Sequence, residues 1–276
     1  MTPPGATPPP VGRVDHPAYG VLRPVTALAS VLLAENPSPM TLDGTNTWVL
    51  RAPGVEECVV IDPGEEDDEE HLRRVAEQGP VARILLTHRH PDHAGAARRF
   101  AELTGAPVQA LDPTLVLGSE ALGDGDVVAA AGVELRVVAT PGHTSDSISF
   151  LLAGPGGGTP SVLTGDTILG RGTTVIAHPD GALGPYLDSL KILADLPPGT
   201  AVLPGHGPDL ADAPAVAAQY LAHREQRLAQ VRAALRALPE GATPRQVVET
   251  VYADVDEKLW PAAELSVKAQ LEYLRS

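Results

Sequence analysis

Three histidines and one aspartate crowd into six consecutive positions, and this cluster constrains the fold more than any other part of the chain. Residues 87–95 read Thr-His-Arg-His-Pro-Asp-His-Ala-Gly. Three imidazoles and a carboxylate this close together are poorly suited to a core and are typical of a divalent metal site. Among the common ions, Zn²⁺ best matches imidazole and carboxylate donors. The candidate ligands are His88, His90, Asp92 and His93.

The local sequence places this cluster on a loop at the end of a strand. Residues 81–86 form an apolar run that predicts a buried strand. Pro91 excludes a continuous helix through the cluster, so a helix can begin only near Asp92. The spacing therefore differs from a His-Glu-x-x-His zinc helix, in which both imidazoles share one helical face.

Four further short β-type runs end in the same way, at a turn followed by one histidine or aspartate. Runs 58–61, 135–139, 161–163 and 201–203 lead to Asp62, His143, Asp166 and His206, respectively. Glycine and proline at these points allow sharp turns and close backbone approach. If the ends of these strands lie at one edge of a sheet, their polar side chains converge on one site.

The ordered set resembles the metallo-β-lactamase-fold hydrolases. The resemblance rests on His-x-His-x-Asp-His at 88–93 followed by His143, Asp166 and His206, and it covers roughly residues 20–210. It implies an α/β fold, a four-layer αβ/βα sandwich with two metal ions at one edge.

The resemblance also implies a role for each candidate ligand. The first ion would be held by three imidazoles, those of His88, His90 and His143. The second would be held by Asp92, His93 and His206, and Asp166 would bridge both ions. Asp92 would also have a catalytic role, orienting the hydroxide that the two ions share.

Two shorter stretches, 36–47 and 165–170, are similar to the branch of this superfamily that contains β-lactamase-like protein 2. Members of that branch add a small helical, winged-helix-like C-terminal domain, and some cleave single-stranded RNA. We therefore expect three parts. They are a disordered lead-in at 1–16, a catalytic domain at 17–212 and the winged-helix-like domain at 213–276.

Hydrophobic periodicity predicts the remaining elements. Residues 20–64 read as a β-meander, and further strands are expected near 107–110 and 147–152. Helices are expected near 67–78, 93–103, 184–195, 214–238, 244–253 and 261–274.

Composition limits the function. The formal net charge of −15 argues against indiscriminate nucleic-acid binding. The single cysteine, Cys58, excludes an internal disulfide framework and fits a reducing, cytoplasmic compartment. No apolar run reaches the length of a membrane span, so we expect no membrane partner.

Three residues outside the ligand set each have two interpretations. Asp62 either caps its own turn or orients a ligand imidazole from behind, the arrangement we favour. Asn46 either suits its Gly-Thr-Asn turn or contacts substrate at the rim of the site. Arg171 either faces solvent or binds an anionic group of the substrate.

The leading hypothesis is a binuclear metal-dependent hydrolase. Its first expected substrate is single-stranded RNA, because of the branch resemblance, with a modest contribution from the arginines at 224–236. These arginines could instead mediate a contact between subunits of a homo-oligomer. The alternative substrate is a small-molecule ester, thioester or lactone, as in glyoxalase II. A non-enzymatic metal-binding module is disfavoured, because it has no need of seven ligands.

Overall fold

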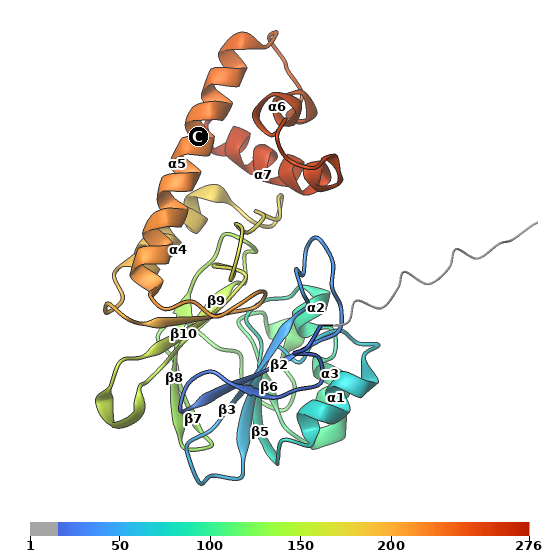
Figure 1. The fold of residues 1–276 in the computed structure, drawn as a ribbon, viewed down its shortest axis with the longest axis vertical. Helices are drawn as coiled ribbons and strands as arrows, with labels where there is room; N and C mark the ends of the chain where they lie inside the picture. The colour runs from blue at the N-terminus through green and yellow to red at the C-terminus, as the bar shows by residue number, and fades with distance from the viewer. Residues whose placement is uncertain (1–15, 276) are drawn as a thin grey trace, which may run out of the picture.

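A computed structural model describes residues 16–275. Two β-sheets pack face to face, and helices cover their outer faces (Figure 1). The predicted four-layer αβ/βα sandwich is therefore confirmed, with further helices at its C-terminal end. All but the last residue of the predicted lead-in lies outside the described residues.

The first sheet contains six strands in sequence order. They are β1 (Arg23–Pro24), β2 (Ala29–Leu33), β3 (Asn46–Leu50), β4 (Cys58–Ile61), β5 (Val81–Leu85) and β6 (Val108–Gln109). The strands are antiparallel as far as β4, as the predicted meander requires, and β4, β5 and β6 are parallel. Side chains alternate between faces, so Trp48 and Leu50 meet the second sheet, whereas Val49 meets the helices.

The second sheet has the order β11-β10-β9-β8-β7. Its strands are β7 (Val127–Ala130), β8 (Val133–Ala139), β9 (Ile148–Leu152), β10 (Ser161–Gly165) and β11 (Ala201–Pro204). Neighbours are antiparallel except β10 and β11, so β8, β10 and β11 run in one direction and end at the same edge. These three strands carry the turns that lead to His143, Asp166 and His206.

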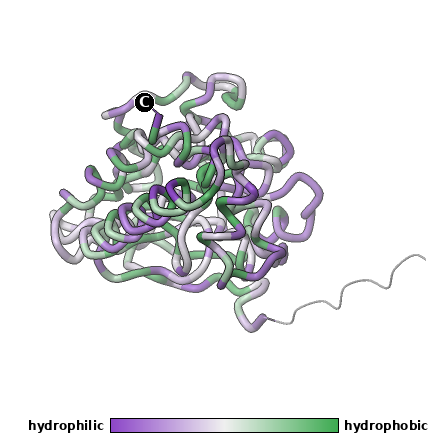
Figure 2. Tube along the Cα trace, turned by 90° about the horizontal axis from the view of Figure 1, so that it is seen from above, coloured by the Kyte–Doolittle hydropathy of each residue, from purple (hydrophilic) through white to green (hydrophobic). Residues whose placement is uncertain are grey.

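Helices cover both sheets and form the C-terminal end. They are α1 (Glu69–Ala76), α2 (Pro91–Ala94), α3 (Ala97–Thr104), α4 (Leu183–Ala194), α5 (Ala213–Ala237), α6 (Pro244–Val251) and α7 (Trp260–Tyr273). Short 3₁₀ turns occur at Pro113–Leu115, Pro155–Gly157 and Glu257–Leu259. Hydrophobic and hydrophilic residues are interspersed along the chain, including its helical turns (Figure 2).

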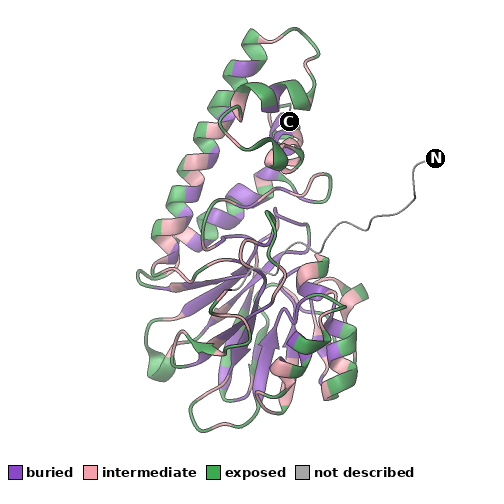
Figure 3. Ribbon diagram, turned by 45° about the vertical axis from the view of Figure 1, so that its right-hand side comes forward, coloured by how far each residue is buried: buried purple, intermediate pink, exposed green. Residues whose placement is uncertain are grey.

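Four apolar clusters hold these layers together. One lies between the sheets and contains Trp48 and Phe150, and the second joins the first sheet to α1 and α3 through Leu72 and Phe100. The third packs α4 and α5 on the second sheet, and the fourth joins α5, α6 and α7. The strands are mostly buried, and the helices keep one exposed side (Figure 3).

Helix α5 belongs to two of these clusters. Ala217 and Leu228 pack in the third cluster, together with α4 and the second sheet, whereas Val231 packs in the fourth cluster against α6 and α7. Asp212 caps the helix by accepting a hydrogen bond from the Ala215 N–H at 3.2 Å. The domain boundary at 212 stays a prediction, and the helix that follows it is packed on both sides.

The structure differs from the predicted elements at two places. The helix expected at 93–103 is divided into α2 and α3, because the Ala96 N–H donates to the Gly64 carbonyl instead of continuing the helical ladder. Strand β7 was not predicted. It pairs only with β8, at the edge of its sheet, and Val127 is exposed there.

Among residues 16–275, no helix combines the length and the apolar character needed to cross a membrane.

We predict that Leu190→Ala lowers the free energy of unfolding by about 2–5 kcal/mol, because removing a buried leucine leaves a cavity. Leu190 is fully buried in the cluster between α4 and α5. Urea denaturation followed by circular dichroism measures the change. The matched control is Ile192→Ala on the same helix. Ile192 is 45% exposed, and its loss should cost less than about 0.5 kcal/mol. Equal losses in both variants would contradict this packing.

Candidate metal centre

The strand ends meet at one edge of the sandwich. The Ile148 N–H donates to the Thr87 carbonyl at 2.9 Å, and the Asn46 N–H donates to the Gly205 carbonyl at 2.8 Å. An isolated bridge pairs Thr45 with His206. These contacts join the two sheets beside the loops that carry the candidate ligands.

Two histidines of the 88–93 loop and one histidine from the second sheet form a first group. The His90 Nδ1 lies 3.1 Å from the His88 Nε2 and 3.0 Å from the His143 Nε2. His88 and His143 are buried, and His90 is half-buried. The ligand atoms of this group all lie within 4.8 Å of one another, which is close enough to surround one ion.

A second group contains Asp92, His93 and His206. The His206 Nε2 lies 3.1 Å from the His93 Nε2 and 3.1 Å from the Asp92 Oδ2. The Asp92 Oδ2 also lies 3.4 Å from the His93 Nε2. Two imidazoles and a carboxylate thus face a common point.

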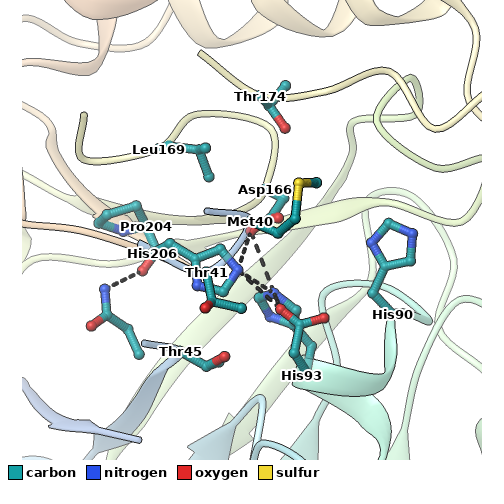
Figure 4. A network of polar contacts seen from close by, with 12 residues as sticks. Met40, Thr41, Thr45, His90, His93, Asp166, Leu169, Thr174, Pro204 and His206 are labelled. Carbon is teal, nitrogen blue, oxygen red and sulfur yellow. Dashed lines mark hydrogen bonds and ion pairs between the residues drawn. The ribbon is translucent and has the colours of Figure 1, made fainter. Parts of the chain in front are cut away.

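The carboxylate of Asp166 lies between the two groups. Its Oδ1 is 3.4 Å from the His93 Nε2 and 3.5 Å from the His206 Nε2, and its Oδ2 is 3.6 Å from the His143 Nε2. One oxygen therefore faces each group. Figure 4 shows His93, Asp166 and His206 directed toward one another, with Met40 beside them.

In a neutral imidazole, a hydrogen bond donated by the outer nitrogen leaves the inner nitrogen without hydrogen. The Nδ1 atoms of His143 and His206 donate to the carbonyls of Val175 and Gly44, at 2.6 and 3.1 Å. Each ring therefore presents the lone pair of its Nε2, as a metal ligand must.

Asp62 and Thr87 hold two further imidazoles in the same way. Asp62 is 1% exposed, and its Oδ2 accepts hydrogen bonds from the Thr87 hydroxyl at 2.6 Å and the His93 Nδ1 at 2.9 Å. Its Oδ1 accepts the Thr87 N–H at 2.8 Å. Because its hydroxyl hydrogen is engaged, the Thr87 oxygen accepts from the His88 Nδ1 at 3.0 Å.

This donor set fits divalent cations. The inner nitrogens of His93 and His206 are 3.1 Å apart, and two lone pairs at that distance repel each other unless a proton or a cation lies between them. The buried Asp166 Oδ1 has no hydrogen-bond partner within residues 16–275. A cation bound by the two nitrogens and the Asp166 Oδ1 would give each of these three atoms a partner.

Electrostatics keep both carboxylates ionised. Burial opposes ionisation of Asp166, but His206 and His93 outweigh it and hold the pKa of Asp166 well below its usual range. Asp92 behaves similarly beside His93, so its pKa is also lowered. Burial lowers the pKa of His90 to about 4, which leaves this imidazole neutral and free to coordinate.

Burial also opposes protonation of His93, but Asp92, Asp166 and Asp62 together raise its pKa well above the usual value. These carboxylates thus favour a proton in the second group, and a metal ion bound there would displace it.

Arg89 lies between His88 and His90 in sequence and anchors the 88–93 loop through ion pairs on the side away from the candidate ligands. Its Nε lies 3.1 Å from the Asp146 Oδ1 and its Nη1 3.5 Å from the Asp180 Oδ1. Asp180 in turn accepts hydrogen bonds from the N–H and hydroxyl of Ser145. The sequence offered no signal for this network, because its members are far apart along the chain.

The two residues predicted to contact substrate, Asn46 and Arg171, differ in their surroundings. Both amide hydrogens of Asn46 are used, at 3.0 Å on the Pro204 carbonyl and 2.8 Å on the Gly207 carbonyl. Asn46 is buried and supports the turn that carries His206. Arg171 lines two cavities near the site and forms a two-point ion pair with Asp43, at 2.5 and 2.8 Å.

A cavity of about 390 Å³ opens from His143 and Asp166 toward the C-terminal helices. Its volume falls in the usual range for small-molecule sites. Its walls are mainly apolar and come from three parts of the chain. Among the lining residues are Met40, Leu42, Leu169, Val255, Leu259 and Ala263.

The C-terminal helices also hold the loop that follows Asp166. The Tyr220 hydroxyl accepts the Leu169 N–H at 3.1 Å and shares its hydrogen between the carbonyls of Gly172 at 2.9 Å and Leu169 at 3.2 Å. The Ser266 hydroxyl accepts the Ile176 N–H at 3.3 Å. These helices therefore form one side of the site, which sequence periodicity did not indicate.

Comparison with known proteins agrees with this geometry. Residues 40–206 match the Metallo-beta-lactamase superfamily, and residues 243–276 match the Beta-lactamase associated winged helix domain. The first match spans more than half of the chain. The chain belongs to the metallo-β-lactamase superfamily of hydrolases, as the resemblance indicated.

Two curated relatives and one solved structure illustrate the similarity. The Beta-lactamase-like protein 2 homolog of Drosophila melanogaster is 32% identical, covering 88% of this chain and 86% of its own. The Atrochrysone carboxyl ACP thioesterase of Aspergillus fumigatus is 31% identical, covering 89% of this chain and 80% of its own. A Beta-lactamase domain protein from Burkholderia ambifaria shares the fold, with a TM-score of 0.76 and 24% identity, over 95% of this chain and 90% of its own.

We predict that Asp62→Asn weakens zinc binding about 10–100-fold, because an amide cannot accept hydrogen bonds on both sides as the carboxylate does. Competition with a chromogenic chelator measures the affinity. The matched control is Asp126→Asn, an exposed turn residue that accepts the Gly123 N–H. Equal zinc affinity in the wild type and Asp62→Asn would refute a supporting role for Asp62.

Proposed function

We propose that this protein is a binuclear metal-dependent hydrolase that cleaves a small-molecule thioester or ester. The observation that carries the proposal is the position of Asp166. Its two oxygens face two separate ligand groups, and it lines the mainly apolar cavity of about 390 Å³.

We assign His88, His90 and His143 to one ion and Asp92, His93 and His206 to the other, with Asp166 shared. Zn²⁺ is the proposed ion, because imidazole and carboxylate oxygen are its usual donors in the absence of thiolate. When bound, the ions would supply Lewis acidity toward the substrate carbonyl and lower the pKa of a nearby water.

The residues of the chain provide the remaining parts of catalysis. Asp92, the most accessible carboxylate of the ligand set, is proposed to orient the attacking water through its carboxylate. Asp62 keeps the His93 imidazole in the orientation that binds metal. Met40, Leu42 and Leu169 form an apolar wall on one side of the cavity, which suits the apolar part of a substrate.

Two observations favour an acyl substrate over RNA. The cavity walls suit an apolar acyl group, and one similar curated protein is named a thioesterase. Among the arginines expected to contact RNA, Arg224 is only 3% exposed, and Arg171 is already paired with Asp43. Phosphate contacts require accessible basic groups, which this net-acidic chain supplies sparingly.

Single-stranded RNA remains the second candidate. The similarity to a Beta-lactamase-like protein 2 homolog and the winged-helix match favour it. In this alternative, exposed arginines on α5, such as Arg232 and Arg236, would contact the RNA backbone.

We predict that the zinc-loaded protein holds close to two ions per chain. His90→Ala and Asp166→Ala should each bind less metal, whereas their far-UV circular dichroism should match the wild type, because both residues lie on loops. Elemental analysis after gel filtration gives the stoichiometry. A stoichiometry of one ion in the wild type would contradict the binuclear assignment.

A substrate panel tests the reaction. The zinc-loaded protein should hydrolyse an S-acyl-N-acetylcysteamine thioester faster than it cleaves single-stranded RNA or a chromogenic cephalosporin. Asp166→Ala is the background control for each substrate. RNA cleavage above this control, without thioester turnover, would reverse the ranking.

A further inference from the structure

The cavity beside the candidate metal centre is lined by two chemically different sets of polar residues. His143 and Asp166 form one set, and His223, Arg224 and Arg227 of helix α5 form the other. The remaining walls are mainly apolar. A ligand that spans this cavity would meet the metal ligands with one end and a cluster of basic groups with the other.

Arg224 is the central member of this basic cluster. Its side chain is buried, with 3% exposure, and lies over the ring of Tyr186 at 5.1 Å from the ring centroid. One guanidinium nitrogen donates to the Thr174 carbonyl. The Nε is buried and has no hydrogen-bond partner among residues 16–275. A buried donor without a partner is costly, which indicates that a ligand completes it.

His223 and Arg227 extend the cluster. The buried Nδ1 of His223 also has no hydrogen-bond partner in the described part of the chain. Arg227 stacks on Tyr252 at 4.6 Å and donates to Gln230 and to the Val251 carbonyl. Burial lowers the pKa of His223, and the nearby Arg224 and Arg227 lower it further.

No carboxylate within residues 16–275 forms an ion pair with any of these three residues, in contrast to Arg171, which pairs with Asp43. A buried guanidinium is normally compensated by an anion, since burying an unpaired charge is expensive. Arginine is especially suited to carboxylate and phosphate groups.

We propose that Arg224, Arg227 and His223 form a binding subsite for an oxyanion of the substrate. This inference rests on the proposed thioester or ester hydrolysis and specifies its substrate class. The substrate is a small acyl compound with a carboxylate or phosphate group, separated from the scissile carbonyl by an apolar segment.

A purely structural role for Arg224 makes a different prediction. Arg224 holds the Thr174 carbonyl, and the Thr174 hydroxyl lies 3.2 Å from the His143 Nδ1. If Arg224 served only to position this segment, its replacement would slow all substrates equally. An anion subsite instead changes the preference between charged and neutral substrates.

The test uses three S-acyl-N-acetylcysteamine thioesters of similar length. They carry a glutaryl group, a 4-phosphonobutanoyl group or the neutral methyl ester of the glutaryl group. The measured quantity is the ratio of kcat/KM for each acidic thioester to that for the neutral one. The zinc-loaded wild type is compared with Arg227→Gln, Arg224→Gln and the control Arg232→Gln. Arg232 is exposed on the same helix and is absent from the cavity wall.

We expect the wild type to prefer one acidic thioester about tenfold to a hundredfold, the range for hydrogen bonds to charged groups. The larger of the two ratios identifies carboxylate or phosphate as the anion. Arg227→Gln should lower this ratio, mainly through KM, and Arg232→Gln should retain it. A wild-type ratio near one, or an unchanged ratio in both Arg224→Gln and Arg227→Gln, overturns the proposal.

Ligand binding separates this proposal from the proposed reaction. Glutarate and inorganic phosphate are titrated calorimetrically into the zinc-loaded wild type and Arg227→Gln, whose metal ligands are identical. Weaker binding to Arg227→Gln supports the subsite even when no thioester is turned over, an outcome that contradicts only the proposed reaction. Equal affinities of both proteins for both anions overturn the subsite.

Discussion

The buried carboxylate of Asp62 connects the end of β4 to the loop that carries four candidate ligands. One oxygen accepts the Thr87 N–H, and the other accepts the Thr87 hydroxyl and the His93 imidazole. The Thr47 hydroxyl donates to the Asp62 carbonyl and lies 2.8 Å from the buried His71 imidazole. This chain of contacts passes from helix α1 to the metal centre, and it sets the direction of two ligand rings.

The second sheet meets this centre through backbone contacts and through its C-terminal helices. Strands β10 and β11 are parallel, so Asp166 and His206 leave the sheet at the same edge. Tyr220, Arg224 and Ser266 then hold the segment between Leu169 and Ile176, which includes the carbonyl that orients His143. The C-terminal helices thus form a wall of the candidate site, and their packing fixes the segment that orients His143.

Groups of opposite charge line the cavity. The ionised carboxylate of Asp166 attracts cations, whereas Arg224 and Arg227 provide positive charge. The remaining walls are mainly apolar. We propose that such a cavity selects a small molecule by size and charge, and this is the basis for ranking an acyl substrate above RNA.

The sequence by itself determined the ligand types, their order and the strands that carry them, because metal ligands and buried strands impose local patterns of histidine, aspartate and apolar residues. It also predicted the helices after Ala213 from their periodicity. Tertiary structure alone decided the contacts of Asn46, Arg89, Tyr220 and Arg224. Their partners are distant along the chain, and no local spacing encodes such contacts. The division between α2 and α3 has the same cause, since the competing hydrogen bond comes from Gly64, outside the helix.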